Sequence, residues 1–196
     1  MLEKELLLPS AGNRHYNPSL LEMQGRLLLA YRYQPGTGAS RIALCELKGG
    51  VPQASQMIQL AEEGGLRHED PRLFWHAGSP WLAYTEAKGY PGPWTCCMRL
   101  ARLQQGQDGV WRAVQFTPLT FRYNGQLGQE KNWQFFSHEG GLFFVYRIRP
   151  HEVVQIDPDS GKVLKHYETD LTVHDRKACA ATKQGDAFIW ALRESG

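Results

Sequence analysis

Asp70 lies in the most distinctive charged motif of this 196-residue chain, Glu69-Asp70-Pro71-Arg72. Proline fixes its own φ angle and disfavours the helical region for the residue before it, so Asp70 is held in an extended or turn conformation. A general acid needs such a fixed position, together with a pKa that lets it keep a proton near neutral pH. The alternative is a structural turn in which Asp70 forms an ion pair with Arg72.

Basic residues recur near the ends of the other predicted strands, with few carboxylates among them. They are Arg32, Arg41, Arg99, Lys131, Arg147, Arg149 and His151. Arginine offers paired donors that match two phosphate oxygens, lysine adds a positive charge, and histidine can donate to a further oxygen. A pocket that collects these side chains would suit a bound phosphate. Each residue taken singly could equally be a solvated strand end.

The elements that would position these residues follow one repeated pattern, a glycine-led turn and then an apolar, aromatic strand. The aromatic ends of the four copies are Tyr31, Tyr84, Tyr146 and Trp190. They recur about every fifty residues, which is the period of propeller blades. Second strand-like runs follow the first three copies, over residues 40–47, 97–103 and 152–157. The pattern predicts an all-β propeller, with an ordinary β-sandwich as the alternative.

A propeller would bring the charged residues together. Equivalent strand ends of successive blades meet at the mouth of one channel, so residues far apart in the sequence become neighbours. No low-complexity linker divides the chain, and we expect residues 1–196 to form a single domain.

Composition argues against several classes of partner. The formal net charge of +2 gives no strong field for nucleic acid, and no glycine-rich phosphate loop leads into a helix. The N-terminus lacks the basic region of a signal peptide, and no apolar run is long enough to span a membrane. The four cysteines, Cys45, Cys96, Cys97 and Cys179, have no metal-type spacing. We expect a cytoplasmic protein with reduced thiols, no metal, no nucleic acid and no membrane partner.

Six motifs together carry a family resemblance. In order, they are Asn17-Pro18-Ser19, Leu29-Ala30-Tyr31-Arg32, Ser40-Arg41-Ile42-Ala43, Glu69-Asp70-Pro71-Arg72, Glu130-Lys131-Asn132-Trp133 and Pro150-His151. This order resembles glycoside hydrolase family 130 and its relatives, five-bladed propellers that include phosphorylases of β-mannosides. The resemblance implies that Asp70 is the catalytic acid. It also implies a phosphate-binding group made of Arg72, Arg99, Lys131 and His151.

Further residues are expected to contact the substrate. They are Asn17, Arg32, Arg41, Glu69, Tyr84, Glu130, Trp133 and Arg147. Flat rings stack on the apolar faces of sugars, although most of the tyrosines are expected to pack within the blades. Trp133 is the aromatic residue that we expect to be the exception.

The resemblance implies inverting phosphorolysis of a β-mannoside or similar oligosaccharide, with inorganic phosphate as co-substrate and no other cofactor. Hydrolysis is an alternative and needs a general base, for which Glu69, Glu130 and Glu139 are candidates and Glu130 is preferred. A glycan-binding or assembly propeller without catalysis is the alternative from another class.

The fourth repeat has only begun where the sequence ends. A five-bladed propeller needs about three hundred residues, so about three and a half blades are expected here. We therefore expect a missing C-terminal segment or another subunit of the same chain to cover Phe188, Ile189 and Trp190.

Overall fold

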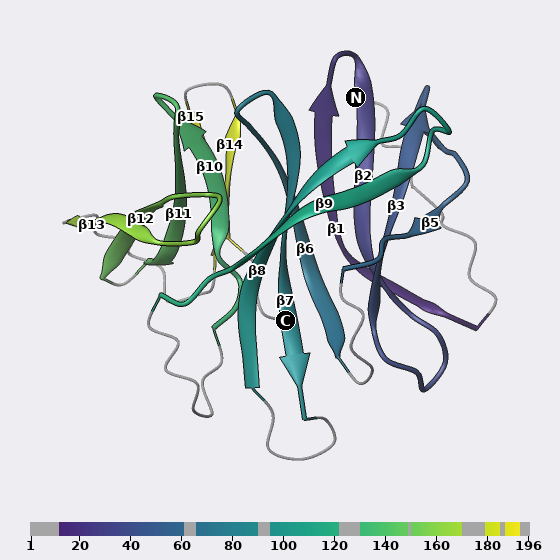
Figure 1. The fold of residues 1–196 in the computed structure, drawn as a ribbon, viewed down its shortest axis with the longest axis horizontal. Helices are drawn as coiled ribbons and strands as arrows, with labels where there is room; N and C mark the ends of the chain where they lie inside the picture. Colours follow the sequence, from purple (N-terminus) through teal and green to yellow (C-terminus); the bar gives the residue numbers. More distant parts are fainter. Residues whose placement is uncertain are drawn as a thin grey trace.

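The structure of this chain is a computed structural model that describes residues 12–60, 66–89, 95–121, 130–148, 150–169, 179–184 and 187–192. All the regular secondary structure in these ranges consists of β-strands, and the strands form four antiparallel sheets (Figure 1). Within the same ranges, no helix is long and apolar enough to cross a membrane.

Each sheet is a meander in which successive strands pair with one another, as in a propeller blade. The first blade contains β1 (Arg14–Met23), β2 (Arg26–Gln34), β3 (Arg41–Lys48), β4 (Val51–Pro52) and β5 (Gln56–Met57), of which β4 and β5 both pair with β3. The second blade contains β6 (Arg67–His76), β7 (Ser79–Lys88), β8 (Thr95–Gln105) and β9 (Trp111–Pro118). The third contains β10 (Gln134–His138), β11 (Gly141–Ile148), β12 (His151–Ile156) and β13 (Val163–Thr169). A two-stranded sheet follows, made of β14 (Cys179–Gln184) and β15 (Ala187–Leu192).

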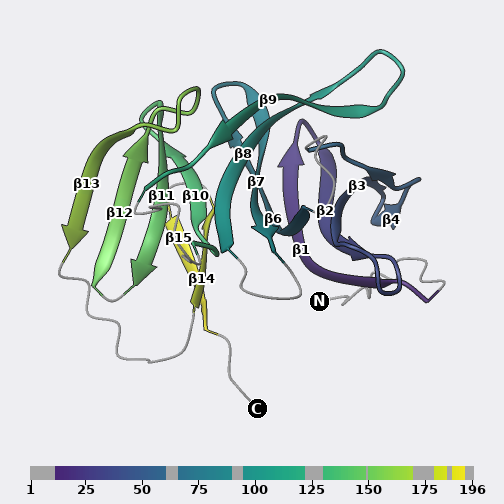
Figure 2. The same cartoon turned by 60° about the horizontal axis from the view of Figure 1, so that its bottom comes forward.

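The first strand of each sheet lies on the inner side of the arrangement. Strand β6 contacts both β1 and β10, and β10 contacts β14. Figure 2 shows the three larger sheets side by side, with β13 at one side and β3 and β4 at the other. The predicted propeller is therefore confirmed, and the sandwich alternative is wrong.

Two-residue hairpins explain the glycine-led pattern. The pairs Gln24-Gly25, Ala77-Gly78 and Glu139-Gly140 each join the first and second strands of a blade, and both residues of each pair have positive φ. Two successive positive φ angles define the type I′ turn, whose twist matches that of the strands it connects. In the third copy, the turn glycine is Gly140 rather than Gly141.

The apolar core lies between neighbouring blades, so the second blade is buried on both faces. Leu82 and Tyr84 of β7 belong to the cluster that includes Leu28 and Ile42 of the first blade. Trp81 and Ala83 alternate with them and belong to the cluster shared with the third blade. Alternate side chains of a strand point to opposite faces, so β7 needs apolar residues at consecutive positions.

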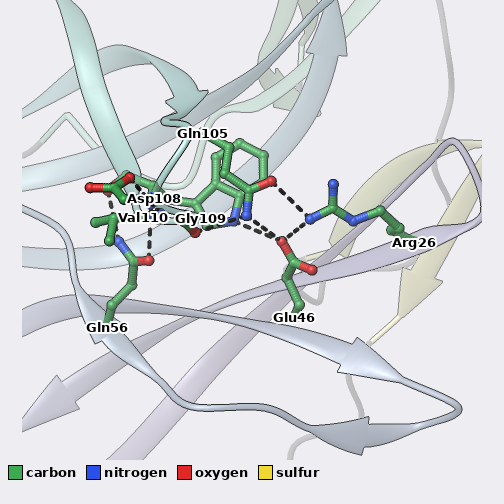
Figure 3. A network of polar contacts seen from close by, with 8 residues as sticks. Arg26, Glu46, Gln56, Gln105, Asp108, Gly109 and Val110 are labelled. Carbon is green, nitrogen blue, oxygen red and sulfur yellow. Dashed lines mark hydrogen bonds and ion pairs between the residues drawn. The ribbon is translucent and has the colours of Figure 1, made fainter.

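A polar network joins the first two blades beside the β1–β2 hairpin (Figure 3). The carboxylate of Glu46 accepts hydrogen bonds from Arg26, from Gln105 Nε2 at 2.9 Å and from Trp111 Nε1 at 3.1 Å. Gln56 exchanges two hydrogen bonds with the backbone of Trp111, at 2.7 and 3.0 Å. These contacts hold β9 of the second blade against β3 and β5 of the first.

Two expectations concern residues outside the described part of the chain. Arg149 lies outside the described residues, as do the side chains of Phe188, Ile189 and Trp190. The covering of these three side chains by another segment or subunit stays a prediction.

Candidate functional site

The antiparallel register places most of the candidate residues at one end of the first three blades. This end carries the starts of β1, β6 and β10, and the ends of β2, β7 and β11 pair beside them. We call it the inner mouth and define it by Asn17, Arg32, Glu69, Asp70 and Glu130. Its defining residues come from the first two blades and from the segment that leads into the third.

Asn17 and Asp70 occupy equivalent places on the inner strands of successive blades. Each has a left-handed backbone, with φ of 52° and 51°, each precedes a proline, and each lies where the strand register shifts. Asn and Asp tolerate this conformation better than other side chains with a Cβ. A bulge redirects the side chain at its position, and strained backbone of this kind concentrates at functional sites.

Asn132 is a third member of this series, which the sequence analysis missed. Its φ is 64°, and it lies two residues before β10, the inner strand of the third blade. The signal was present in the sequence, because Asn17, Asp70 and Asn132 each occur inside one of the motifs that carry the family resemblance. The left-handed backbone could not be inferred for any of the three, since proline directs the residue before it toward extended backbone and Asn132 precedes a tryptophan.

The two carboxylates of the Glu69-Asp70 pair are held from the first blade. Asn17 Nδ2 donates to Asp70 Oδ1, and Arg32 Nη1 lies 3.8 Å from the same oxygen. Glu69 Oε1 accepts from Arg32 Nη2 at 2.7 Å and from Ser40 Oγ at 3.1 Å. The side chains of Glu69 and Asp70 each retain 16% exposure, so both are partly accessible to a ligand.

Arg72 lies near Asp70 without forming the ion pair of a simple turn. Its Nη1 donates to the Pro71 carbonyl at 2.9 Å, while the cation within 4 Å of Asp70 among the described residues is Arg32. Burial lowers the pKa of Arg72, and the neighbouring Asp70 carboxylate acts in the opposite direction. The structural alternative of an Asp70–Arg72 turn ion pair is thus wrong, because the left-handed backbone directs Asp70 toward the first blade.

The third blade brings Glu130 and Lys131 to the same region. The Glu130 backbone N–H donates to the Cys96 carbonyl at 3.1 Å, and Tyr146 Oη donates to Glu130 Oε1 at 3.2 Å. Burial raises the pKa of the Cys96 thiol to about 11, and Glu69 and Glu130 add to the rise while Lys131 opposes it. The charges of Glu69, Glu130 and Lys131 therefore all act on the Cys96 thiol.

Arg41 and Arg99 belong to a separate cluster around His68, between the first and second blades. Arg99 donates to Glu86 Oε1 from Nε at 3.2 Å and from Nη2 at 2.8 Å, and Arg41 donates to the Leu66 carbonyl at 3.0 Å. His68 is 3% exposed, and its Nε2 has no hydrogen-bond partner among the described residues. Burial lowers the pKa of His68 to about 4, with Arg41 and Arg99 adding to the fall and Glu86 opposing it. These arginines therefore have protein partners of their own.

Arg147 and His151 lie on the second and third strands of the third blade. Arg147 forms an ion pair with Glu152, which is directly opposite it in the sheet and fully buried. Burial lowers the pKa of His151. The convergence of His151 with Arg72 and Lys131 on one anion stays a prediction.

The expectation that Trp133 is an exposed sugar platform is wrong. Its side chain is 1% exposed and stacks on Phe144, with ring centroids 4.3 Å apart and planes 3° apart. The residue follows Asn132 directly and belongs to the core cluster shared by the second and third blades. Tyr84 is also 1% exposed and packs its edge on His68, so the packing role expected for it is confirmed and the substrate contact is wrong.

Comparison with known proteins adds fold neighbours. No family model and no curated sequence matches this chain. Zg3597, a family 117 glycoside hydrolase of the marine bacterium Zobellia galactanivorans, superposes with a TM-score of 0.66 at 11% identity over 97% of this chain and 67% of its own. The family 43 endo-arabinanase of Bacillus licheniformis has a TM-score of 0.56 at 13% identity over 88% and 63%. The arabinanase Arb43A of Bacillus subtilis has a TM-score of 0.54 at 12% identity over the same shares.

These similarities concern the fold. The chain spans about two thirds of the length of the structures that it matches. At such low identity, they support the β-propeller architecture, and membership of family 130 stays an expectation.

Proposed function

We propose that the inner mouth binds a saccharide and that this chain contributes the catalytic acid for cleavage of a glycosidic bond. The observation that carries the proposal is the position of Asp70. Its left-handed backbone and its hydrogen bond from Asn17 hold one partly exposed carboxyl group among residues of two blades. The glycoside hydrolases among the fold neighbours support a carbohydrate substrate.

The geometry of Asp70 suggests which oxygen would carry the proton. Oδ1 accepts the hydrogen bond from Asn17 and lies nearest to Arg32, so protonation at Oδ2 leaves these contacts intact. In the proposed reaction, Oδ2–H protonates the departing glycosidic oxygen, directly or through a sugar hydroxyl, as the bond between this oxygen and the anomeric carbon breaks.

Inorganic phosphate is the nucleophile that we propose. An oxygen of phosphate attacks the anomeric carbon from the opposite face, which yields an inverted sugar 1-phosphate and a shortened saccharide. Arg72, whose pKa is influenced by Asp70, and Lys131, next to Glu130 in the sequence, would bind the phosphate, with His151 and Arg99 as further members of the expected group. Because phosphate is already a nucleophile, the site needs no general base.

Hydrolysis is the second candidate, and the position of the Glu130 carboxylate favours it. Glu130 is held by Tyr146 at the same end of the blades as Asp70 and could activate water as a base. All the fold neighbours described above are hydrolases. A β-mannoside is the proposed substrate on the family resemblance, and arabino-oligosaccharides are the next class to test.

The test is to incubate the chain with each oligosaccharide, with and without inorganic phosphate, and to analyse the products. Sugar 1-phosphate that forms only with phosphate supports phosphorolysis, and free reducing sugar in both conditions supports hydrolysis. Asp70→Asn is expected to lower either activity by at least about a hundredfold, since the amide cannot donate the acidic proton. Saccharide binding without any product would contradict catalysis and favour the glycan-binding alternative.

A further inference from the structure

Three side chains with metal-ligating atoms lie together on the outer strands of the third blade. They are Glu152 on β12 and His166 and Glu168 on β13. One ligand atom from each lies within 4.8 Å of the other two. The cysteine spacing had suggested no metal, but it says nothing about this histidine and its two glutamates.

The sheet register explains why these residues meet. Glu152 lies directly opposite Glu168, and Val154 lies directly opposite His166. Residues two apart on a strand project from the same face, and directly opposed residues share a face. His166 and Glu168 therefore stand beside each other on the face that also carries Glu152.

The buried glutamate is already oriented by the protein. Glu152 is 0% exposed, one of its oxygens binds Arg147, and the other lies 2.8 Å from His166 Nε2. The ring of Phe121 packs its edge against the His166 imidazole, with centroids 5.4 Å apart, which orients the ring. Two carboxylates directly opposite each other repel, so a cation bound between Glu152 and Glu168 would remove an unfavourable contact.

We propose that Glu152, His166 and Glu168 form a binding site for one divalent transition-metal ion. The imidazole nitrogen favours zinc, cobalt or nickel over calcium and magnesium, which prefer oxygen ligands alone. Three protein ligands on one face of a sheet leave further coordination positions for water. A metal binds Nε2 only when this nitrogen carries no proton. In the neutral ring the proton then lies on Nδ1, and a protonated ring must release one proton to solvent, so binding weakens as the pH falls.

The chain also offers a matched control for this site. His138 lies next to Glu139, with 3.8 Å between Nε2 and the carboxylate, and both side chains are exposed. Like Glu152 and His166, this is a pair of one glutamate and one histidine. It belongs to no group of three potential ligands among the described residues. His138→Gln therefore removes an exposed histidine without touching Glu152.

The experiment is a titration of the full chain with Zn²⁺ and, separately, with Co²⁺. We expect one equivalent to bind, and we expect His166→Gln and Glu168→Gln each to lower the affinity by at least about tenfold. His138→Gln should bind like the unmodified chain. The visible spectrum of the Co²⁺ form should lack a sulfur-to-cobalt charge-transfer band, since no thiol is among the ligands. Unchanged affinity in both variants, a thiolate band, or no binding would each overturn the site, and none of these results bears on the proposed chemistry of Asp70.

Discussion

The pairing of Asn17 with Asp70 links backbone conformation to chemistry at the scale of single residues. Both residues have a left-handed backbone on an inner strand, and the amide of one donates to the carboxyl group of the other. The conformation turns each side chain away from the regular alternation of its strand. We infer that the role of Asn17 is to position Asp70, in addition to any contact with substrate.

Replacing Asn17 with glycine should lower turnover and leave stability nearly unchanged. Glycine accepts the positive φ at this position but removes the hydrogen bond to Asp70. We expect turnover to fall by about ten- to a hundredfold, the range for a hydrogen bond to a charged group. The measurement is the initial rate on the active oligosaccharide together with the melting temperature.

Gln24→Gly is the matched control for that variant. Gln24 has the same φ of 52°, but it lies in the exposed turn between β1 and β2, far from Asp70 in the strand register. Glycine there should leave the rate unchanged. Equal rates in the two variants would contradict a positioning role for Asn17.

Buried polar groups between neighbouring blades govern stability at the scale of elements. His68 links the inner strand of the second blade to the first blade, where its backbone N–H donates to the Ser40 carbonyl at 3.1 Å. Burial lowers the pKa of its imidazole to about 4, so the folded chain favours the neutral ring. The unfolded chain takes up a proton at the ordinary pKa of 6.5. The contribution of His68 to stability is therefore fully present above pH 6.5 and is lost as the pH falls from 6.5 toward 4.

His68→Gln should reduce this pH dependence. Between pH 7.5 and pH 5, we expect the unmodified chain to lose about 2 kcal/mol of unfolding free energy through His68. Urea unfolding of both proteins at the two pH values measures the difference, and the variant should lose less by about that amount. Other buried histidines, such as His76, titrate equally in both proteins and cancel. An identical pH dependence in the two proteins would contradict the burial of an uncharged His68.

Glu46 is the shared acceptor of the polar network at the β1–β2 hairpin end of the blades (Figure 3). Its carboxylate accepts hydrogen bonds from Arg26, Gln105 and the buried Trp111. Glu46→Ala should lower the unfolding free energy by about 1–3 kcal/mol, because the indole N–H loses its acceptor inside the protein. Denaturant unfolding measures the loss.

Asp108→Ala, at the exposed end of the same network, is the control for Glu46, although it also removes the acceptor of the Val110 N–H. Asp108 pairs with Arg112 at 2.6 Å, but both side chains are about half exposed. Exposed ion pairs contribute little, so this variant should unfold at the same denaturant concentration as the unmodified chain. If both variants were equally stable, the network would not be what holds β9 to the first blade.

The whole molecule is a series of blades whose cores lie between them, so a ligand that joins blades should stabilise all of them. The proposed phosphate site combines Arg72 of the second blade with Lys131 at the start of the third. Phosphate that binds the folded chain alone raises the melting temperature as its concentration rises.

We therefore expect millimolar phosphate to raise the melting temperature of the full chain at constant ionic strength. Chloride at the same ionic strength separates specific binding from screening. Lys131→Ala should reduce the shift, measured relative to the unliganded melting temperature of the same variant. The same melting temperature in phosphate and chloride would contradict a phosphate site.

The sequence alone determined the repeat and the strands. These features depend on local chemistry, because two-residue turns need residues that accept positive φ and strands need a period of two. The motif around Asp70 was recognisable from its residues, but its left-handed backbone was not, because a proline normally directs the residue before it toward extended backbone.

Tertiary structure decided which charged residues share a site. Arg99 pairs with Glu86, Arg147 pairs with Glu152, and Asp70 turns to Asn17 and Arg32 rather than to its sequence neighbour Arg72. These choices depend on cross-strand register and on bulges, and a register shift of one residue moves a side chain to the opposite face. The burial of Trp133, the residue before β10, has the same origin, because only the packing of the third blade against the second determines which of its side chains face the core.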